Sequence, residues 1–226
     1  MALHLKSPER IAQMLAVLAL MILILLAGKP SFTNASEPVR GIRDPAIALQ
    51  VARNVDEIDA ILGPAPSADR EVMRLKQFLD FALIVTYVAI AIAMAVAMRR
   101  MRPLALTLLL CVIAAGIFDW TENLAILRLL PLDLGETTQP IIDSIRRASL
   151  AKWSLIALAL ALLSIFFFRS RRWYLRVLAA WDLAAGALAC YGVFHNEWLP
   201  WAAGLLSAGL VASAATLKLL THESAS

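Results

Sequence analysis

Residues 78–98 read FLDFALIVTYVAIAIAMAVAM and end directly against Arg99 and Arg100. The stretch contains a single charged residue, Asp80, close to its beginning. About 20 consecutive, mostly apolar residues form a helix long enough to cross the hydrocarbon core of a bilayer. The stretch therefore predicts a membrane-spanning helix, with two arginines just beyond its end.

The composition of the whole chain agrees with this stretch. The sequence has 226 residues, of which 61% are hydrophobic and 17% charged, and its mean hydropathy is +0.74. Soluble domains average about 45–50% apolar and about 25% charged residues, and a core of this size cannot bury so much apolar surface. The composition excludes a disordered chain, a disulfide scaffold, a fibrous repeat and an ordinary cytosolic enzyme. It predicts an all-α, polytopic transmembrane bundle that forms one integral membrane domain.

Six apolar segments are candidates for the spans of this bundle. They are residues 11–27, 78–98, 104–124, 153–168, 175–194 and 199–220. The first span follows Lys6 and Arg10, which is also the arrangement of a signal peptide. Its apolar run is long for a cleaved signal, so an uncleaved anchor is the favoured interpretation and a cleaved signal the alternative.

The basic residues near the ends of the spans predict the orientation, because cytoplasmic loops carry an excess of Lys and Arg. With the N-terminus in the cytoplasm, Lys6, Arg10 and the basic clusters at 99–102 and 169–176 all lie inside. The connection at 131–152 is the exception, with three basic and three acidic residues. We therefore expect six spans with both termini in the cytoplasm.

The same clusters are better explained by membrane orientation than by binding to nucleic acid, which we do not expect. The expected location is a cell membrane, as a multi-pass protein of the bacterial inner membrane. The expected partners are the lipid bilayer itself and either a lipid-like ligand or another membrane protein.

The long polar connection at 28–77, which this orientation places outside the cell, contains one predicted amphipathic helix at 44–62. Asp44 can cap it and Pro45 fits the first helical position. Gly63 ends it. Its apolar residues recur at helical spacing, namely Ile47, Val51, Val55, Ile58 and Leu62. The helix is interpreted either as a packed loop helix or as a lid over a site.

The third span carries polar residues where lipid is expected, since residues 116–124 read GIFDWTENL. Asp119, Glu122 and Asn123 have the spacing i, i+3, i+4 and share one helix face. An ionisable residue at the centre of a span costs about 2.5–3.5 kcal/mol and usually faces protein or water. At a rise of about 1.5 Å per residue from Leu104, both acids lie in the outer part of a core roughly 30 Å thick.

Other ionisable residues are expected at a similar depth, and they complete a candidate ligand or proton site. The candidate residues are Asp119, Glu122, Asn123, Asp80, His195, Glu197 and Lys152. Carboxylates with a histidine and an asparagine can ligate a divalent metal, and close carboxyl groups can share a proton. No cofactor motif is evident, so a divalent metal is the cofactor that this set would allow. The alternative is a hydrogen-bonded clamp between helices.

A second set of buried charges is predicted nearer the cytoplasmic side. Asp182 in the fifth span and Lys218 in the sixth have comparable depths. A paired charge needs no further function, so these two residues are interpreted as a structural ion pair.

These features predict an outward-facing acidic pocket that binds a small or lipid-like ligand or a cation, with proton coupling as one mode of action. Asp119 and Glu122 would contact the ligand or hold a proton, and Asn123 would orient it. Two alternatives stay open. One is an intramembrane enzyme acting on a lipid or isoprenoid substrate, and the other is an accessory or assembly subunit whose buried polar residues are structural. No residue is identified as catalytic from the sequence.

Overall fold

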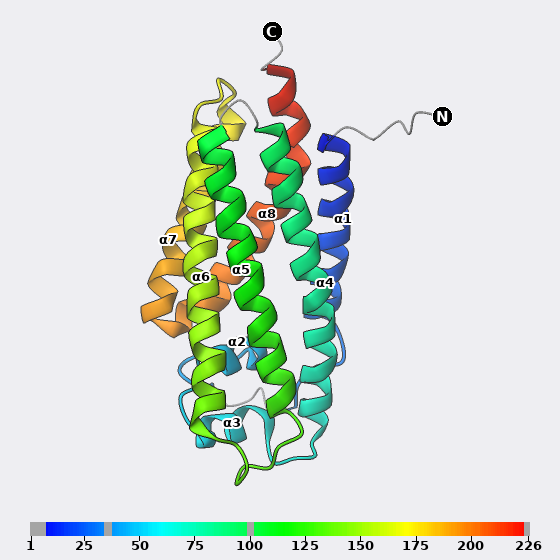
Figure 1. The fold of residues 1–226 in the computed structure, drawn as a ribbon, viewed down its shortest axis with the longest axis vertical. Coiled ribbons are helices and arrows are strands. Elements are labelled where there is room, and N and C mark those ends of the chain that lie inside the picture. Colours follow the sequence, from blue (N-terminus) through cyan, green and yellow to red (C-terminus); the bar gives the residue numbers. More distant parts are fainter. Residues whose placement is uncertain (1–7, 34–37, 99–101, 224–226) are drawn as a thin grey trace, which may run out of the picture.

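The computed structural model describes residues 8–33, 38–98 and 102–223, and within these ranges the regular structure is helical. Figure 1 shows the arrangement. The α-helices are α1 (Pro8–Ala27), α2 (Pro45–Val51), α3 (Val55–Leu62), α4 (Ala68–Ala97), α5 (Arg102–Leu129), α6 (Gln139–Phe168), α7 (Trp173–Phe194) and α8 (Leu199–Glu223), with a short 3-10 turn, η2 (Asn196–Trp198).

Six of these helices, α1 and α4 to α8, are long and apolar enough to cross a membrane. The prediction of an all-helical protein with six candidate spans is therefore confirmed. Three of the helices are longer than a bilayer requires, since α4 and α6 have 30 residues and α5 has 28. At about 1.5 Å per residue they reach beyond a hydrocarbon core of roughly 30 Å.

The six long helices form a closed ring. The main packing contacts join them in the order α1, α4, α5, α6, α7, α8 and back to α1, and α4 also contacts α8. The first turn of α1, the start of α5 and the last turn of α8 lie at one end of the bundle, at the top of Figure 1. Helices α2 and α3 lie at the opposite end, between the projecting ends of α4, α5 and α6.

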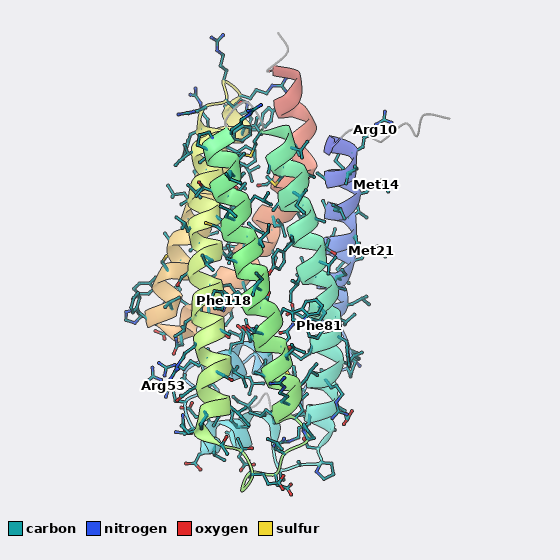
Figure 2. All side chains as sticks on the ribbon, viewed as in Figure 1. Arg10, Met14, Met21, Arg53, Phe81 and Phe118 are labelled. Carbon is teal, nitrogen blue, oxygen red and sulfur yellow. The ribbon has the colours of Figure 1, made fainter. Side chains whose placement is uncertain are left out.

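The outer surface of this ring is apolar. Met14 and Met21 on α1 are 56% and 57% exposed and point away from the bundle (Figure 2). Large exposed side chains of the same kind occur on all six long helices. An apolar surface of this extent is stable against hydrocarbon but not against water, which is what a multi-pass membrane protein requires.

Residues 38–63, which include α2 and α3, form a layer that we call the cap. Asp44 begins α2, because its side chain accepts hydrogen bonds from two backbone N–H groups of the first turn. Asn54 begins α3 by accepting from the N–H of Glu57. Gly63, at φ 67°, ends α3. The prediction of one helix over 44–62 is therefore wrong, because the Asn54 side chain competes for the backbone and starts a new helix.

Arg70 at the start of α4 ties the cap to the bundle. The residue is 1% exposed. Nε donates to the carbonyl of Gly63 at 3.1 Å, and Nη1 donates to the carbonyl of Leu130 at 2.9 Å and of Leu132 at 3.1 Å. The last carbonyl groups of a helix lack partners inside the helix, so this arginine satisfies the end of α5 while holding α4 and the cap against it.

Candidate functional site

One buried ammonium group joins two carboxylates between α5 and α6. Lys152 Nζ lies 2.8 Å from Asp119 Oδ1 and 2.8 Å from Glu122 Oε2. The three residues are 4%, 5% and 1% exposed, respectively. Asp119 and Glu122 are three positions apart on α5, so their side chains leave the same face of the helix toward α6.

Two hydroxyl groups complete the surroundings of these carboxylates. Ser149, one turn before the lysine on α6, donates from Oγ to Glu122 Oε2 at 2.6 Å. Tyr87 on α4 donates from its phenol to Asp119 Oδ2 at 3.1 Å. Both oxygens of Asp119 therefore accept hydrogen bonds, one from α6 and one from α4.

A third carboxyl group belongs to the same network. The side-chain amide of Asn123 donates from Nδ2 to Asp80 Oδ2 at 2.8 Å and so connects α5 to α4. Asn123 is buried, whereas Asp80 is partly exposed. We call the whole set the acidic cluster, which consists of Asp80, Tyr87, Asp119, Glu122, Asn123, Ser149 and Lys152.

The acidic cluster contains more negative than positive groups. With every group ionised, Asp80, Asp119 and Glu122 carry three negative charges against the one positive charge of Lys152. Glu122 Oε1 is buried and has no hydrogen-bond partner among the described residues. An uncompensated charge inside a membrane bundle is destabilising. The cluster therefore has the composition of a site that takes up a proton or another positive group.

A glycine allows α4 and α5 to come close enough for this network. A Cβ placed on Gly116 would lie 3.0 Å from Val88 Cγ2 and 3.5 Å from the Tyr87 hydroxyl. Small residues at helix contacts in membranes permit such close approach. Gly116 lies one turn before Asp119, so the glycine is next to the point where the phenol of Tyr87 reaches across.

The cap is attached beside Lys152. The next residue, Trp153, donates from Nε1 to Gln50 Oε1 of α2 at 3.0 Å, and its ring lies 5.6 Å from Lys152 Nζ. Gln139 at the start of α6 donates to the carbonyl of Arg53 at 2.7 Å. Arg53 lies at the edge of the cap in Figure 2. Helix α2 is therefore fastened to α6 next to the acidic cluster.

Two hollows on the described surface lie away from the acidic side chains. One borders α1 alone, and the other is a groove between α4 and α5. None of the seven residues of the acidic cluster lines either hollow. The carboxyl groups are thus packed against protein groups rather than arranged around either hollow.

His195 and Glu197 lie elsewhere, at the connection between α7 and α8. Both are exposed, and the imidazole of His195 stacks on Tyr191 with ring centroids 4.3 Å apart. The Cβ of Glu197 lies 3.0 Å from where a Cβ would stand on Gly41 of the cap. In the described part of the chain, neither side chain is bonded to the acidic cluster. Helix α6 separates α7 from α5 in the ring, so equal depth in the membrane does not bring these residues together.

Tyr87 and Ser149 are cluster residues that the predicted site does not include. Tyr87 follows Asp80 by seven positions and Ser149 precedes Lys152 by three. These spacings put each residue on the same helix face as its charged neighbour. A search for hydroxyl groups on the faces of the charged residues would have found both.

Asp182 is buried between α7 and α8. Its Oδ2 accepts from Ser213 Oγ at 3.0 Å, and Oδ1 has no hydrogen-bond partner among the described residues. The side chain of Lys218 lies outside the described residues, so the predicted ion pair stays a prediction. A Cβ on Gly209 would lie 2.5 Å from Asp182 Oδ1. The glycine is therefore what lets α8 pack against this carboxyl group.

In the residues that the structure describes, no three His, Cys, Asp or Glu side chains are grouped as ligands for a metal ion. The expectation of a divalent metal thus stays a prediction. Comparison with known proteins adds no family: no protein-family model, curated protein or solved structure matches the chain. The function has to be inferred from the acidic cluster.

Proposed function

We propose that the chain is a multi-pass membrane protein that binds a proton at the acidic cluster and couples this proton to the binding of a small or lipid-like ligand. The observation that carries the proposal is the arrangement around Lys152, where one ammonium group serves two buried carboxylates. A third carboxyl group, Asp80, is joined to them through Asn123. Ionisable groups inside a membrane bundle usually mark a path for protons, ions or substrates.

A proton suits the geometry better than a hydrated cation. A proton on Glu122 Oε1 would lower the excess negative charge and needs no cavity. A cation would need several further oxygen ligands around it, and no such group is formed by acidic side chains in the described ranges. The partly exposed Asp80 is the member of the cluster through which a proton would enter from the side of the cap.

We infer further that both ends of the chain face the cytoplasm and that the cap lies outside. Basic residues support this orientation. Arg10 of α1, Arg102 of α5 and the arginines that follow α6 all belong to the end of the bundle opposite the cap. With this orientation the acidic cluster lies in the outer half of the membrane. The proposed location is the bacterial inner membrane.

A structural role is the second candidate, and a specific observation favours it. The bonds of Lys152 join α6 to α5, the bond between Asn123 and Asp80 joins α5 to α4, and neither hollow reaches these groups. A closed polar clamp of this kind is what an accessory or assembly subunit would contain. The two candidates differ in whether a carboxyl group gains and loses a proton in the folded protein.

Infrared spectroscopy of the purified protein in lipid nanodiscs tests the proposal. A protonated carboxylic acid has a carbonyl band separate from that of a carboxylate, and we expect this band to change on titration. Glu122→Gln should remove the part that belongs to Glu122. Glu136→Gln, at an exposed position, is the matched control, and Asp182→Asn identifies the contribution of the other buried carboxyl group. An unchanged band in a folded Glu122→Gln variant would overturn the assignment to Glu122.

A further inference from the structure

The groove between α4 and α5 is lined almost entirely by apolar side chains and has a volume of about 500 Å³. Its walls include Val85, Val88 and Ala89 from α4 and Gly116, Ile117 and Trp120 from α5. The rings of Phe81 and Trp120 lie 4.5 Å apart at its end nearest the cap. Hollows of several hundred Å³ are the size that ligands of proteins occupy.

The groove opens toward the bilayer. Val85 and Ile117 on its two walls are 61% and 60% exposed. The hydroxyl of Thr121 already donates to the carbonyl of Phe118 at 2.8 Å, so the groove lacks a free polar group for a polar ligand. From Ile84 to Ile92 it extends about 12 Å, close to the roughly 15 Å thickness of one leaflet's hydrocarbon. These dimensions fit one hydrocarbon chain of one leaflet.

Two arginines continue the faces of the groove toward the cap. Arg74 on α4 precedes Phe81 by seven positions, and Arg128 on α5 follows Thr121 by seven, so each shares its helix face with the groove. Arg128 is exposed, and Arg74 forms a solvent-exposed ion pair with Glu71, its one ion pair within the described ranges. Such pairs contribute little, so both guanidinium groups can bind another anion.

The spacing along the helices matches a phospholipid. The arginines lie about 10–15 Å beyond the end of the groove at Ile84 and Thr121. A lipid whose acyl chain fills the groove has its glycerol and phosphate in this interval. Arginine binds phosphate with two parallel hydrogen bonds and is the preferred residue for it. The apolar groove would thus bind the acyl chain of a lipid, and the two arginines would bind the phosphate of the same molecule.

We propose that the α4–α5 groove together with Arg74 and Arg128 binds an anionic phospholipid, with an acyl chain in the groove and the phosphate at the arginines. The inference is independent of the proton bound by the acidic cluster. It has one consequence for that cluster, because the Tyr87 hydroxyl lies against Gly116. The acyl chain would cover the membrane-facing side of the hydrogen bond from Tyr87 to Asp119.

Native mass spectrometry of the purified protein with added phosphatidylglycerol tests the chain-binding part. Ala89→Phe fills the groove, and Leu106→Phe adds the same ring at an exposed position of α5 outside it. We expect the unmodified protein and Leu106→Phe to retain one phosphatidylglycerol that Ala89→Phe loses. Ile117→Trp, which fills the groove from its other wall, should behave like Ala89→Phe. Equal retention by all four proteins would overturn the groove as the binding site.

The charge-binding part is tested with a double variant and a control of equal charge. Arg74→Gln with Arg128→Gln should weaken retention of phosphatidylglycerol about thirtyfold. Each basic residue near a membrane surface contributes a similar binding free energy toward anionic lipid, and the two losses multiply in the affinity. Arg43→Gln with Arg147→Gln removes two other exposed arginines and should leave retention unchanged. Equal affinities of the two double variants would overturn the phosphate contact. Neither result depends on the infrared band of Glu122, so this inference and the proposed proton site can fail separately.

Discussion

The ammonium of Lys152 lies 2.8 Å from the carboxylate of Asp119, although the two residues are 33 positions apart and belong to different long helices. Neither residue is exposed to an extent that water could solvate its charge. Bringing two charges into a low-dielectric interior is unfavourable unless each has its partner. The contact is therefore a condition for the packing of α5 on α6, whatever else the acidic cluster does.

Removing the ammonium should destabilise the protein strongly. Lys152→Met leaves Asp119 and Glu122 without their shared partner, and breaking a buried pair from one side costs about 3–5 kcal/mol. Thermal unfolding in detergent measures the loss. Lys29→Met, at an exposed position, is the control. Adding Asp119→Asn to Lys152→Met should recover part of the stability, since the double variant removes one orphaned charge. A double variant less stable than either single variant would contradict the pairing.

Loss of the phenol of Tyr87 should have a smaller effect. Tyr87→Phe keeps the ring but removes the hydrogen bond to Asp119 Oδ2. Hydrogen bonds to charged groups contribute about 1.5–3 kcal/mol, so we expect a decrease of this order in the free energy of unfolding. The same measurement on Tyr191→Phe, whose residue is exposed on α7, should show almost no change. Equal stabilities of the two variants would show that the Tyr87 contact does not form.

The spans and part of the acidic cluster could be predicted because each depends on the spacing of residues within one helix. Apolar runs of sufficient length indicate the spans, and the i, i+3, i+4 spacing places Asp119, Glu122 and Asn123 on one face. The expected depth in the membrane put Lys152 at the same height as these three residues. These are local properties of the chain, and the structure brings the four side chains together.

What the sequence could not predict is which helices are neighbours. His195 has the right depth, but α6 lies between α7 and α5 in the ring. The division of the predicted 44–62 helix into α2 and α3 was missed for another reason. Asn54 lies within a continuous apolar stripe, and its side chain accepts a backbone hydrogen bond that starts the second helix. Periodicity shows which face of a segment is buried, but not where a side chain interrupts the helix.

The contact between α7 and α8 provides a test with a built-in control. Gly209→Ala places a Cβ 2.5 Å from Asp182 Oδ1, so the buried carboxyl group or the helices must shift and the protein should lose stability. Gly204 is in the same helix and a Cβ there meets nothing within 4 Å. Gly204→Ala should be stabilising by about 0.5–1 kcal/mol, because alanine is the better helix former. Equal changes in melting temperature for the two variants would contradict the close approach at Asp182.

The attachment of the cap to α6 can be weakened by removing one hydrogen bond. Trp153→Phe removes the hydrogen bond from Nε1 to Gln50. A net contribution of about 1 kcal/mol corresponds to roughly fivefold faster opening. We expect this increase in the amide hydrogen exchange of α2 and α3, with exchange in α7 and α8 unchanged. Trp201→Phe, at an exposed position on α8, controls for the loss of an indole. Uniformly faster exchange in all helices would mean that the residue supports the bundle rather than the cap.

The proposed orientation can be measured directly with single cysteines. Cys190 is exposed and Cys111 is buried, so both are first replaced by alanine to give a background without thiols. Asp56→Cys in the cap and Arg171→Cys after α6 then lie at opposite ends of the bundle. A membrane-impermeant maleimide added to intact cells should label the cap position, because the arginine-rich end is retained in the cytoplasm. Labelling of position 171 in place of position 56 would reverse the orientation, and the acidic cluster would then lie in the inner half of the membrane.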